Sequence, residues 1–365
     1  MKHKIAILHT AHWDQLLGGA EQQLKYLANF LLDQGHEVHF IFPKRTKDPI
    51  KGSSLHVHPL NCILVPGVLG KSWFRFKRRI TKKMSSIEPT LIITRSYSSW
   101  AGIAAEYAQK KKIHHFHFVA SDQDVVQNPL PRFLPRPLNR IEFKLGLKVY
   151  NEYSTVFVQS SFQKLEMKRN YQKDTIIMTQ VAPENNSRNL IKKNGIIKIV
   201  WIANLKPLKR PEKFLEIVKK FKENHLLEFI MIGDDREKRY IRQIKMFSSY
   251  HNFKYLGKLP NLETNEILDQ SHILINTSDY EGFSNTFVQA WLRKVVVLSL
   301  NSNPDNILHR QNIGYRTGDI HSTIQKLNQL ILEPDRISSM GERARDYALK
   351  FHTTSKIYDQ FPILS

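Results

Sequence analysis

The chain contains 365 residues, of which 55 are Lys or Arg and 33 are Asp or Glu, so its formal net charge is +22. A hydrophobic share of 41% with 24% charged residues is typical of a globular protein and excludes a disordered chain, and the length favours two domains over a single core. The single cysteine, Cys62, excludes an intramolecular disulfide and a Cys-rich zinc site. The charge indicates an anionic partner: nucleic acid, anionic lipid or a phosphorylated substrate.

The N-terminal residues Met1–His9 contain an apolar stretch that is too short for a signal peptide. No segment has the roughly 18 consecutive apolar residues that span a bilayer. We therefore expect a cytoplasmic protein.

The first half of the chain alternates strand and helix patterns. Apolar residues at helical spacing predict helices over Ala20–Gln34, which ends at Gly35, and over Ala101–Lys110. Ser160 or Ser161 is expected to cap a further helix. Such alternation predicts a parallel sheet wrapped by helices. The expected strands are Lys4–Leu8, Glu37–Phe42, Leu91–Thr94, Phe116–Ala120 and Thr155–Gln159.

The second half repeats this alternation after a polar, non-periodic stretch, Ala182–Arg188, that predicts a linker. The expected strands are Ile197–Ile202, Glu228–Ile232, Ile273–Asn276 and Val295–Ser299. The expected helices are Pro211–Lys222, Glu237–Phe247, Glu263–Gln270, Asn285–Arg293, Ile320–Leu332 and Pro334–Phe351.

These patterns predict an α/β protein with two doubly wound, Rossmann-like domains that face each other across a cleft. The expected domains are residues 1–183 and 184–350, and the tail 351–365 is expected to pack back on the first domain. Ligands of such sheets bind beyond the carboxyl ends of the strands, so we expect the chemistry there.

The segment Asp279–Trp291 is the most informative part of the sequence. It lies between two predicted buried strands, and its loop opens a helix near Asn285, where backbone N–H groups can meet an anion. Glu281 stands at the mouth of the loop, and Gln289 lies in the helix. The arrangement suits a nucleotide-sugar, with the Ser284–Thr286 amides at the diphosphate and the Gln289 amide at ribose hydroxyls. The alternative is an ordinary strand–loop–helix connection with a surface glutamate.

This segment resembles the Glu-x7-Glu signature of the retaining glycosyltransferases of family four, in the variant EGF-x-NTF-x-QAW in which Gln replaces the second Glu. Other motifs of that family follow in its order along nearly the whole chain. They are Gly18–Glu21, Ala203–Leu205, Lys209–Pro211, Met231–Gly233, Asn303–Asp305 and Met340–Arg345.

The resemblance implies the GT-B fold, with an acceptor-binding first domain and a nucleotide-sugar-binding second domain. It places Glu281 near the transferred sugar, either as nucleophile or as electrostatic partner of an oxocarbenium-like transition state. It places Gly282, Phe283 and the amides of Ser284, Asn285 and Thr286 at the donor. It implies no cofactor and no catalytic metal, because protein cations and helix amides take the metal's place. Lys294 and Val296 depart from the Gly and Pro that the family normally has there.

Lys209 follows a predicted strand end and can neutralise a departing diphosphate, which is a large catalytic effect. The resembling family usually has an Arg earlier in this loop, where this chain has Asn204. One expected charge is therefore missing unless Lys206 or Arg210 replaces it. The alternative role of Lys209 is a solvated surface lysine.

Several residues of the first half are acceptor-side candidates. Gly18 and Gly19 allow a ligand to approach the backbone closely, although a tight turn explains them equally. Arg95 ends a predicted strand and can bind an acceptor phosphate or form a structural salt bridge. By resemblance, Asp122 faces the sugar; with Asp124 it also forms an Asp-x-Asp pattern, which holds a divalent metal in the other large glycosyltransferase fold.

The segment Lys71–Lys83 has seven cations, no acidic residue and three aromatic residues. It resembles an interfacial segment that binds anionic lipid. The alternative is a solvated helix whose Trp73 and Phe76 pack inward. No nucleic-acid-binding module surrounds it, so we expect no nucleic acid as partner.

Taken together, these features predict a retaining, metal-independent glycosyltransferase of bacterial surface-polysaccharide synthesis, located at the inner face of the plasma membrane. It would move a sugar from a nucleotide-diphosphate sugar to a lipid-linked or polysaccharide acceptor. The alternatives are a sugar-nucleotide epimerase on the same fold and a non-catalytic basic protein that binds anionic lipid or nucleic acid.

Overall fold

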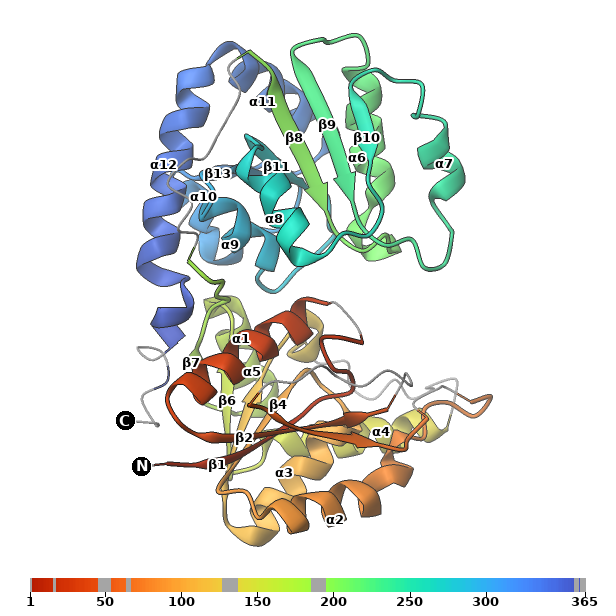
Figure 1. Cartoon of the computed structure of the whole chain (residues 1–365), viewed down its shortest axis with the longest axis vertical. Helices are drawn as coiled ribbons and strands as arrows, with labels where there is room; N and C mark the ends of the chain where they lie inside the picture. The colour runs from red at the N-terminus through yellow and green to blue at the C-terminus, as the bar shows by residue number, and fades with distance from the viewer. Residues whose placement is uncertain are drawn as a thin grey trace. The chain divides into compact units, whose positions relative to one another are not determined.

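The computed structural model describes residues 2–15, 18–44, 54–63, 67–126, 137–184, 195–357 and 361. The chain divides into two compact units (Figure 1). The first unit contains Met1–Gln180 together with the C-terminal residues Thr354–Ser365, and the second contains Val181–Thr353. The start of the expected linker, Ala182, belongs to the second unit, where its N–H donates to the His352 carbonyl at 2.9 Å; residues 185–194 lie outside the described residues.

The described residues of the first unit form a seven-stranded parallel sheet in the order β3-β2-β1-β4-β5-β6-β7. Its strands are β1 (Lys4–Leu8), β2 (Glu37–Pro43), β3 (His56–Leu60), β4 (Leu91–Arg95), β5 (His114–Phe118), β6 (Ser154–Val158) and β7 (Thr175–Ile177). Its helices are α1 (Gly19–Asp33), α2 (Lys77–Ile87), α3 (Ser99–Lys111), α4 (Leu138–Gly146) and α5 (Ser161–Tyr171), with a 3-10 turn, η1 (Trp73–Phe76), before α2.

Both faces of this sheet are covered. The helices α2 and α3 pack on the face that carries Ala6, Leu8 and Ile92, while α1 and α5 lie on the opposite side (Figure 1). The buried tryptophan of α3, Trp100, lies in the core with Ile80 of α2. From the far end of the chain, Phe361 packs among phenylalanines of β5 and β6. It stacks on Phe118 and Phe157 and meets Phe116 edge-on.

The described residues of the second unit form a six-stranded parallel sheet in the order β10-β9-β8-β11-β12-β13. Its strands are β8 (Ile197–Ile202), β9 (Leu227–Ile232), β10 (Phe253–Tyr255), β11 (Ile273–Asn276), β12 (Val296–Ser299) and β13 (Gly314–Arg316). Its helices are α6 (Pro211–Lys220), α7 (Ile241–Lys245), α8 (Asn261–Asp269), α9 (Asn285–Trp291), α10 (Ile307–Arg310), α11 (Ile320–Leu332) and α12 (Pro334–Phe351).

The expected α/β class with two parallel-sheet domains is confirmed. The main deviation in the predicted elements is α7, which is much shorter than the expected helix Glu237–Phe247. Lys238 has a left-handed backbone with φ of 52°, which interrupts a helix. The Asp235 carboxylate then accepts hydrogen bonds from the N–H groups of Arg239, Tyr240 and Ile241 and so fixes the helix start.

A second deviation is β5, which starts and ends two residues earlier than predicted. Two of its histidines, His115 and His117, face the interior, and both bond the Thr94 hydroxyl, at 2.8 and 2.9 Å. Burial lowers the pKa of His115 to about 3, so this imidazole is neutral at pH 7. His117 is fully buried as well.

The loops at the carboxyl ends of β8 and β9 approach each other at Gly233. A Cβ added to this glycine would lie 1.7 Å from the carbonyl oxygen of Ala203. The same glycine donates its N–H to the Gly257 carbonyl at 2.8 Å and accepts a hydrogen bond from the Tyr255 hydroxyl at 2.9 Å. Only glycine fits between these backbone groups.

We expect Gly233→Ala to lower the free energy of unfolding by about 1–3 kcal/mol, because the methyl group collides with backbone that cannot rotate away. Urea denaturation measures the change. Gly67→Ala is the control, since its nearest contact would be an ordinary 3.9 Å. Equal effects of the two substitutions would show that the contact with Ala203 is not tight.

Candidate active site

The candidate site is formed in the second unit by two loops at the carboxyl ends of neighbouring strands. The first loop leaves β8 and runs through Lys206 to the short 3-10 turn Pro207–Lys209 before α6. Arg210 then has a left-handed backbone with φ of 48°, and Pro211 starts the helix. The second loop leaves β11 and carries Glu281 before α9. Since β8 and β11 are parallel neighbours, both loops emerge at the same edge of the sheet.

An ion pair between Lys209 and Glu281 lies at the centre of the site. The Lys209 Nζ is 2.8 Å from the Glu281 Oε1, and only 12% of the glutamate side chain is exposed. The same oxygen accepts hydrogen bonds from the Ser278 hydroxyl at 2.7 Å and from the Asn276 amide at 2.9 Å. Three donors therefore converge on one carboxylate.

Burial of Glu281 disfavours its ionised form, but the charge of Lys209 and the bonds from Lys209, Ser278 and Asn276 outweigh it. The pKa of Glu281 therefore lies below its ordinary value. At neutral pH the site presents a fixed negative charge beside a lysine.

The two loops are also joined by hydrogen bonds between uncharged groups. The Thr277 hydroxyl donates to the Lys209 carbonyl at 2.7 Å and accepts from the buried Trp201 indole N–H at 2.8 Å. The Asp279 N–H donates to the Leu208 carbonyl at 3.0 Å. These bonds hold the backbone of Lys209 against the loop that carries Glu281.

Neither of the neighbouring cations is placed to supply the charge missing at Asn204. The Arg210 guanidinium pairs with Glu212 at 2.5 Å and with Asp279 at 3.4 Å, which neutralises it. Lys206 is exposed at the start of the 3-10 turn, while Asn204 is half-buried. Among these residues only Lys209 contacts Glu281.

The loop Gly282–Ser284 leads directly into α9. Phe283 is buried and its ring lies against Trp291 and His352. The Ser284 hydroxyl bonds the Thr286 hydroxyl at 2.9 Å and makes no cap bond to the helix.

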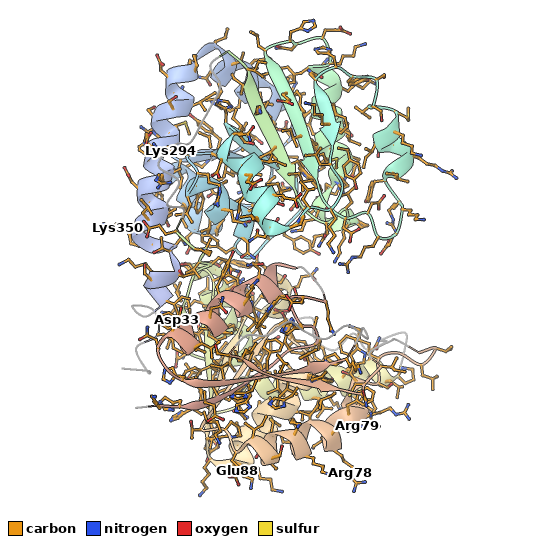
Figure 2. The ribbon with its side chains drawn as sticks, viewed as in Figure 1. Asp33, Arg78, Arg79, Glu88, Lys294 and Lys350 are labelled. Carbon is orange, nitrogen blue, oxygen red and sulfur yellow. The ribbon has the colours of Figure 1, made fainter. Side chains whose placement is uncertain are left out.

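Gln289 is buried and points toward α8. Its amide nitrogen donates to Asn261 at 2.8 Å and to Asn265 at 3.3 Å. Its carbonyl oxygen is then the group left for a ligand hydroxyl. In the turn after α9, Lys294 (labelled in Figure 2) adopts a left-handed φ of 59° and pairs with Glu342 of α12 at 2.6 Å.

The acceptor-side candidates lie in the first unit. Arg95 is buried, donates to Gln180 at 3.1 Å, and has an Nε without a partner among the described residues. Burial lowers its pKa to about 10, although the charges of Asp124 and Glu21 favour the cation. Gly18 caps α1 beside Glu21, whose carboxylate bonds His9 at 3.1 Å, and Gly19 is the first residue of that helix.

Asp124, the second aspartate of the Asp-x-Asp pattern, has a structural role. The Asp124 carboxylate accepts the N–H groups of Ala120 and Ser121 at 3.1 and 3.2 Å in a capping box. Burial raises the pKa of Asp124, which further disfavours a charged metal ligand. Asp122 instead accepts a hydrogen bond from Gln163 at 2.8 Å.

Sequence reasoning missed the residues that hold the site together. Asn276 ends β11, and Thr277 and Ser278 follow it. All three contact Glu281 or Lys209, but in the sequence they only continue an apolar run. The signal that could have identified them is their position, as polar residues at the carboxyl end of a buried strand. A cavity of about 530 Å³ in the second unit, lined by Arg316 and Lys326 among others, contains none of the predicted site residues.

Family models match both halves of the chain. Residues 17–178 match the model of Glycosyltransferase Family 4, and residues 183–347 match that of Glycosyl transferases group 1. A search of curated proteins gives no match.

Solved structures share this fold over nearly the whole chain. Sucrose-phosphate synthase from Thermosynechococcus elongatus has 13% identity and a TM-score of 0.77, covering 99% of this chain and 97% of that one. WaaG, a glycosyltransferase involved in lipopolysaccharide biosynthesis, has 12% identity and a TM-score of 0.75, with coverages of 97% and 98%. Anabaena Alr3699/HepE in complex with UDP and glucose has 14% identity and a TM-score of 0.72, with coverages of 99% and 98%.

The fold is therefore that of the GT-B class of glycosyltransferases. Within that class, the first half of the chain matches Glycosyltransferase Family 4 and the second half matches Glycosyl transferases group 1.

The lowered pKa of Glu281 makes a prediction about acid stability. Its ionised form stabilises the fold above the carboxylate's ordinary pKa, and this contribution disappears as the pH falls through the lower pKa of the folded state. The free energy of unfolding should thus differ most between wild type and Glu281→Gln near pH 7 and should converge on acidification. Urea denaturation from pH 7 to pH 3 measures it, with the exposed Glu342→Gln as control. A difference that grows toward acid would contradict the assignment.

Proposed function

We propose that the protein is a retaining glycosyltransferase that moves a sugar from a nucleotide-diphosphate sugar to a lipid-linked or glycan acceptor. The observation that carries this proposal is the buried, ionised Glu281, held 2.8 Å from Lys209 at the carboxyl ends of β8 and β11. This edge is where doubly wound sheets bind ligands. A bacterial surface polysaccharide is the proposed context.

Glu281 would act on the sugar of the donor. When the bond from the anomeric carbon to the diphosphate breaks, positive charge develops at that carbon, and a fixed carboxylate stabilises it. The three donors on its Oε1 keep the carboxylate ionised and oriented, while Oε2 is the oxygen that can face the sugar.

Lys209 would act on the leaving group. An ammonium has three donors, and Glu281 uses one of them, so the others can reach a diphosphate oxygen. Negative charge on the diphosphate grows as the bond breaks, so a lysine in this position lowers the barrier without a metal. Asn204, on the same loop, would add a hydrogen bond in place of a second cation.

The donor's nucleotide would lie along the loop from Gly282 to Thr286. The structure of Alr3699/HepE contains UDP and glucose, which supports a uridine or related diphosphate as the donor class. The Gln289 amide oxygen would accept a hydrogen bond from a ribose hydroxyl, since its nitrogen is used by Asn261. Phe283 would fix the loop by packing on Trp291.

The acceptor would bind the first unit. Arg95 offers a buried guanidinium with an unpartnered Nε, which suits an acceptor phosphate. Gly18 and Gly19 at the start of α1, and Asp122 after β5, would line the same carboxyl edge of the first sheet.

We further propose that the segment Lys71–Lys83 binds an anionic membrane surface. Arg75, Arg78 and Lys82 are exposed, and the labelled Arg78 side chain projects away from α2 (Figure 2). Trp73 and Phe76 pack against the core, so they are not the apolar contacts with lipid that a membrane segment would need. No helix of the described residues is long and apolar enough to cross a membrane.

Apolar contacts with lipid would come instead from the turn that precedes this segment. Val68 is 93% exposed and Leu69 59% exposed. The Leu69 carbonyl accepts the Leu138 N–H, and the Lys71 N–H bonds Asn139, so the turn is anchored on the start of α4. Exposed leucine and valine beside a row of cations suit the headgroup region of a bilayer.

The catalytic proposal predicts that Glu281→Gln lowers kcat at least tenfold, because the neutral amide cannot stabilise positive charge; tenfold corresponds to about 1.4 kcal/mol of barrier. Release of nucleoside diphosphate from nucleotide-sugars, in the presence of EDTA, measures it. Binding of nucleoside diphosphate should persist, which separates chemistry from folding. The matched control is Glu342→Gln, a surface carboxylate paired with Lys294. Unchanged turnover in Glu281→Gln would refute the assignment, and activity that needs added Mn²⁺ would favour a metal-dependent mechanism.

The membrane proposal predicts that the triple substitution of Arg75, Arg78 and Lys82 by Gln weakens binding to phosphatidylglycerol vesicles by more than a hundredfold. Each cation near an anionic surface contributes about 1 kcal/mol. Sedimentation with vesicles measures it, and donor hydrolysis should be unaffected. The control variant has Gln at Lys219, Lys220 and Lys245, three exposed cations of the second unit. If both variants lose binding equally, net charge rather than this segment is responsible. Equal binding of wild type to neutral vesicles would exclude an electrostatic mechanism.

A further inference from the structure

A histidine cluster lies on the first sheet at the amino ends of β2 and β3. Arg95 lies at the opposite edge of this sheet, where the strands have their carboxyl ends. It contains Glu37 and His39 of β2 and His56 and His58 of β3. The parallel register pairs His39 with His56 and Ile41 with His58. Because side chains alternate along a strand and paired residues share a face, all four side chains lie on one face of the sheet.

The donor atoms of Glu37, His39 and His56 lie within 4.8 Å of one another. The His39 Nε2 is 2.8 Å from the Glu37 Oε1, and the His39 ring stacks on that of His56 with centroids 4.7 Å apart. Ligands around tetrahedral zinc are about 3.4 Å apart, given bonds of about 2.0–2.2 Å. His39 is buried and fixed, whereas Glu37 and His56 are exposed and can rotate the remaining distance.

His58 is placed to orient His39. The His39 Nδ1 is 2.9 Å from the His58 Nε2, and their rings stack with centroids 5.1 Å apart. With a metal on its Nε2, His39 would carry its proton on Nδ1 and donate it to His58. Metal-binding histidines usually have such a partner on the second nitrogen.

We propose that Glu37, His39 and His56 form a binding site for a divalent transition-metal ion, with Zn²⁺ as the best match and water completing its coordination. Two imidazoles and one carboxylate suit zinc, nickel or copper, whereas magnesium and calcium prefer oxygen ligands alone. A bound ion would join the edge strand β3 to β2. It plays no part in the proposed sugar transfer, which depends on residues of the second unit and of the opposite sheet edge.

Two lysines face the cluster. Lys4 lies 3.9 Å from the Glu37 carboxylate, and both side chains are well exposed, so this pair is weak and a metal can displace it. Lys83 belongs to α2, the helix that covers this face, and its positive charge acts electrostatically on His58.

In the test, a chelator first removes any bound metal from the whole chain. ZnCl₂ is then titrated in, and a chromophoric chelator competes with the protein for the ion. We expect one site to fill at one equivalent, and 5 mM MgCl₂ not to compete. His56→Ala and Glu37→Gln should each weaken zinc binding at least tenfold. Both residues are exposed, so these variants should fold, which circular dichroism checks.

The matched control is His225→Ala with His251→Ala, an exposed stacked pair in the second unit with ring centroids 4.2 Å apart. Its zinc affinity should equal that of wild type. Absence of a stoichiometric site in wild type, or unchanged affinity in His56→Ala, would overturn the proposal. Loss of sugar transfer in Glu281→Gln would leave it unaffected, so the two proposals fail independently.

Discussion

The second unit depends on one constraint: a carboxylate removed from solvent must be compensated by donors and by an opposite charge. Lys209 and Glu281 meet this constraint for each other across two loops that are distant in the sequence. The Thr277 hydroxyl, fixed by the Trp201 indole, holds the lysine's backbone in register. The position of the charges therefore depends on the way the loops fold, and removal of Lys209 leaves the Glu281 carboxylate without its opposite charge.

The same pair is suited to an anionic ligand. A lysine that already neutralises a carboxylate leaves no large unpaired charge in the site, yet its ammonium keeps donors for a second anion. Its side chain is 24% exposed, while that of Glu281 is half as accessible. The strong positive charge of the chain as a whole would attract a diphosphate from a distance. The local ion pair thus positions the lysine, whereas the long-range field of the whole chain attracts the ligand.

Much of the architecture follows from sequence pattern, because central strands of a parallel sheet are unbroken apolar runs. This is why β1, β8 and β11 lie at their predicted residues. The edge strands were missed because they are short or polar; β3 reads His-Val-His-Pro-Leu, which has no strand-like apolar run. The sequence pointed to Glu281 and Lys209 as residues of interest, but their contact depends on which strands are neighbours. The bonds of Gln289 to α8 arise in the same way from tertiary packing.

The return of the chain to the first unit has a consequence for its biosynthesis. Residues from Thr354 onward belong to that unit, and Phe361 fills a place among phenylalanines of β5 and β6. A ribosome makes these residues only after the entire second unit. The first unit can therefore collapse early but can complete its core only once the second unit has been made. In this chain the unit that begins first is closed by a contact of very high sequence separation.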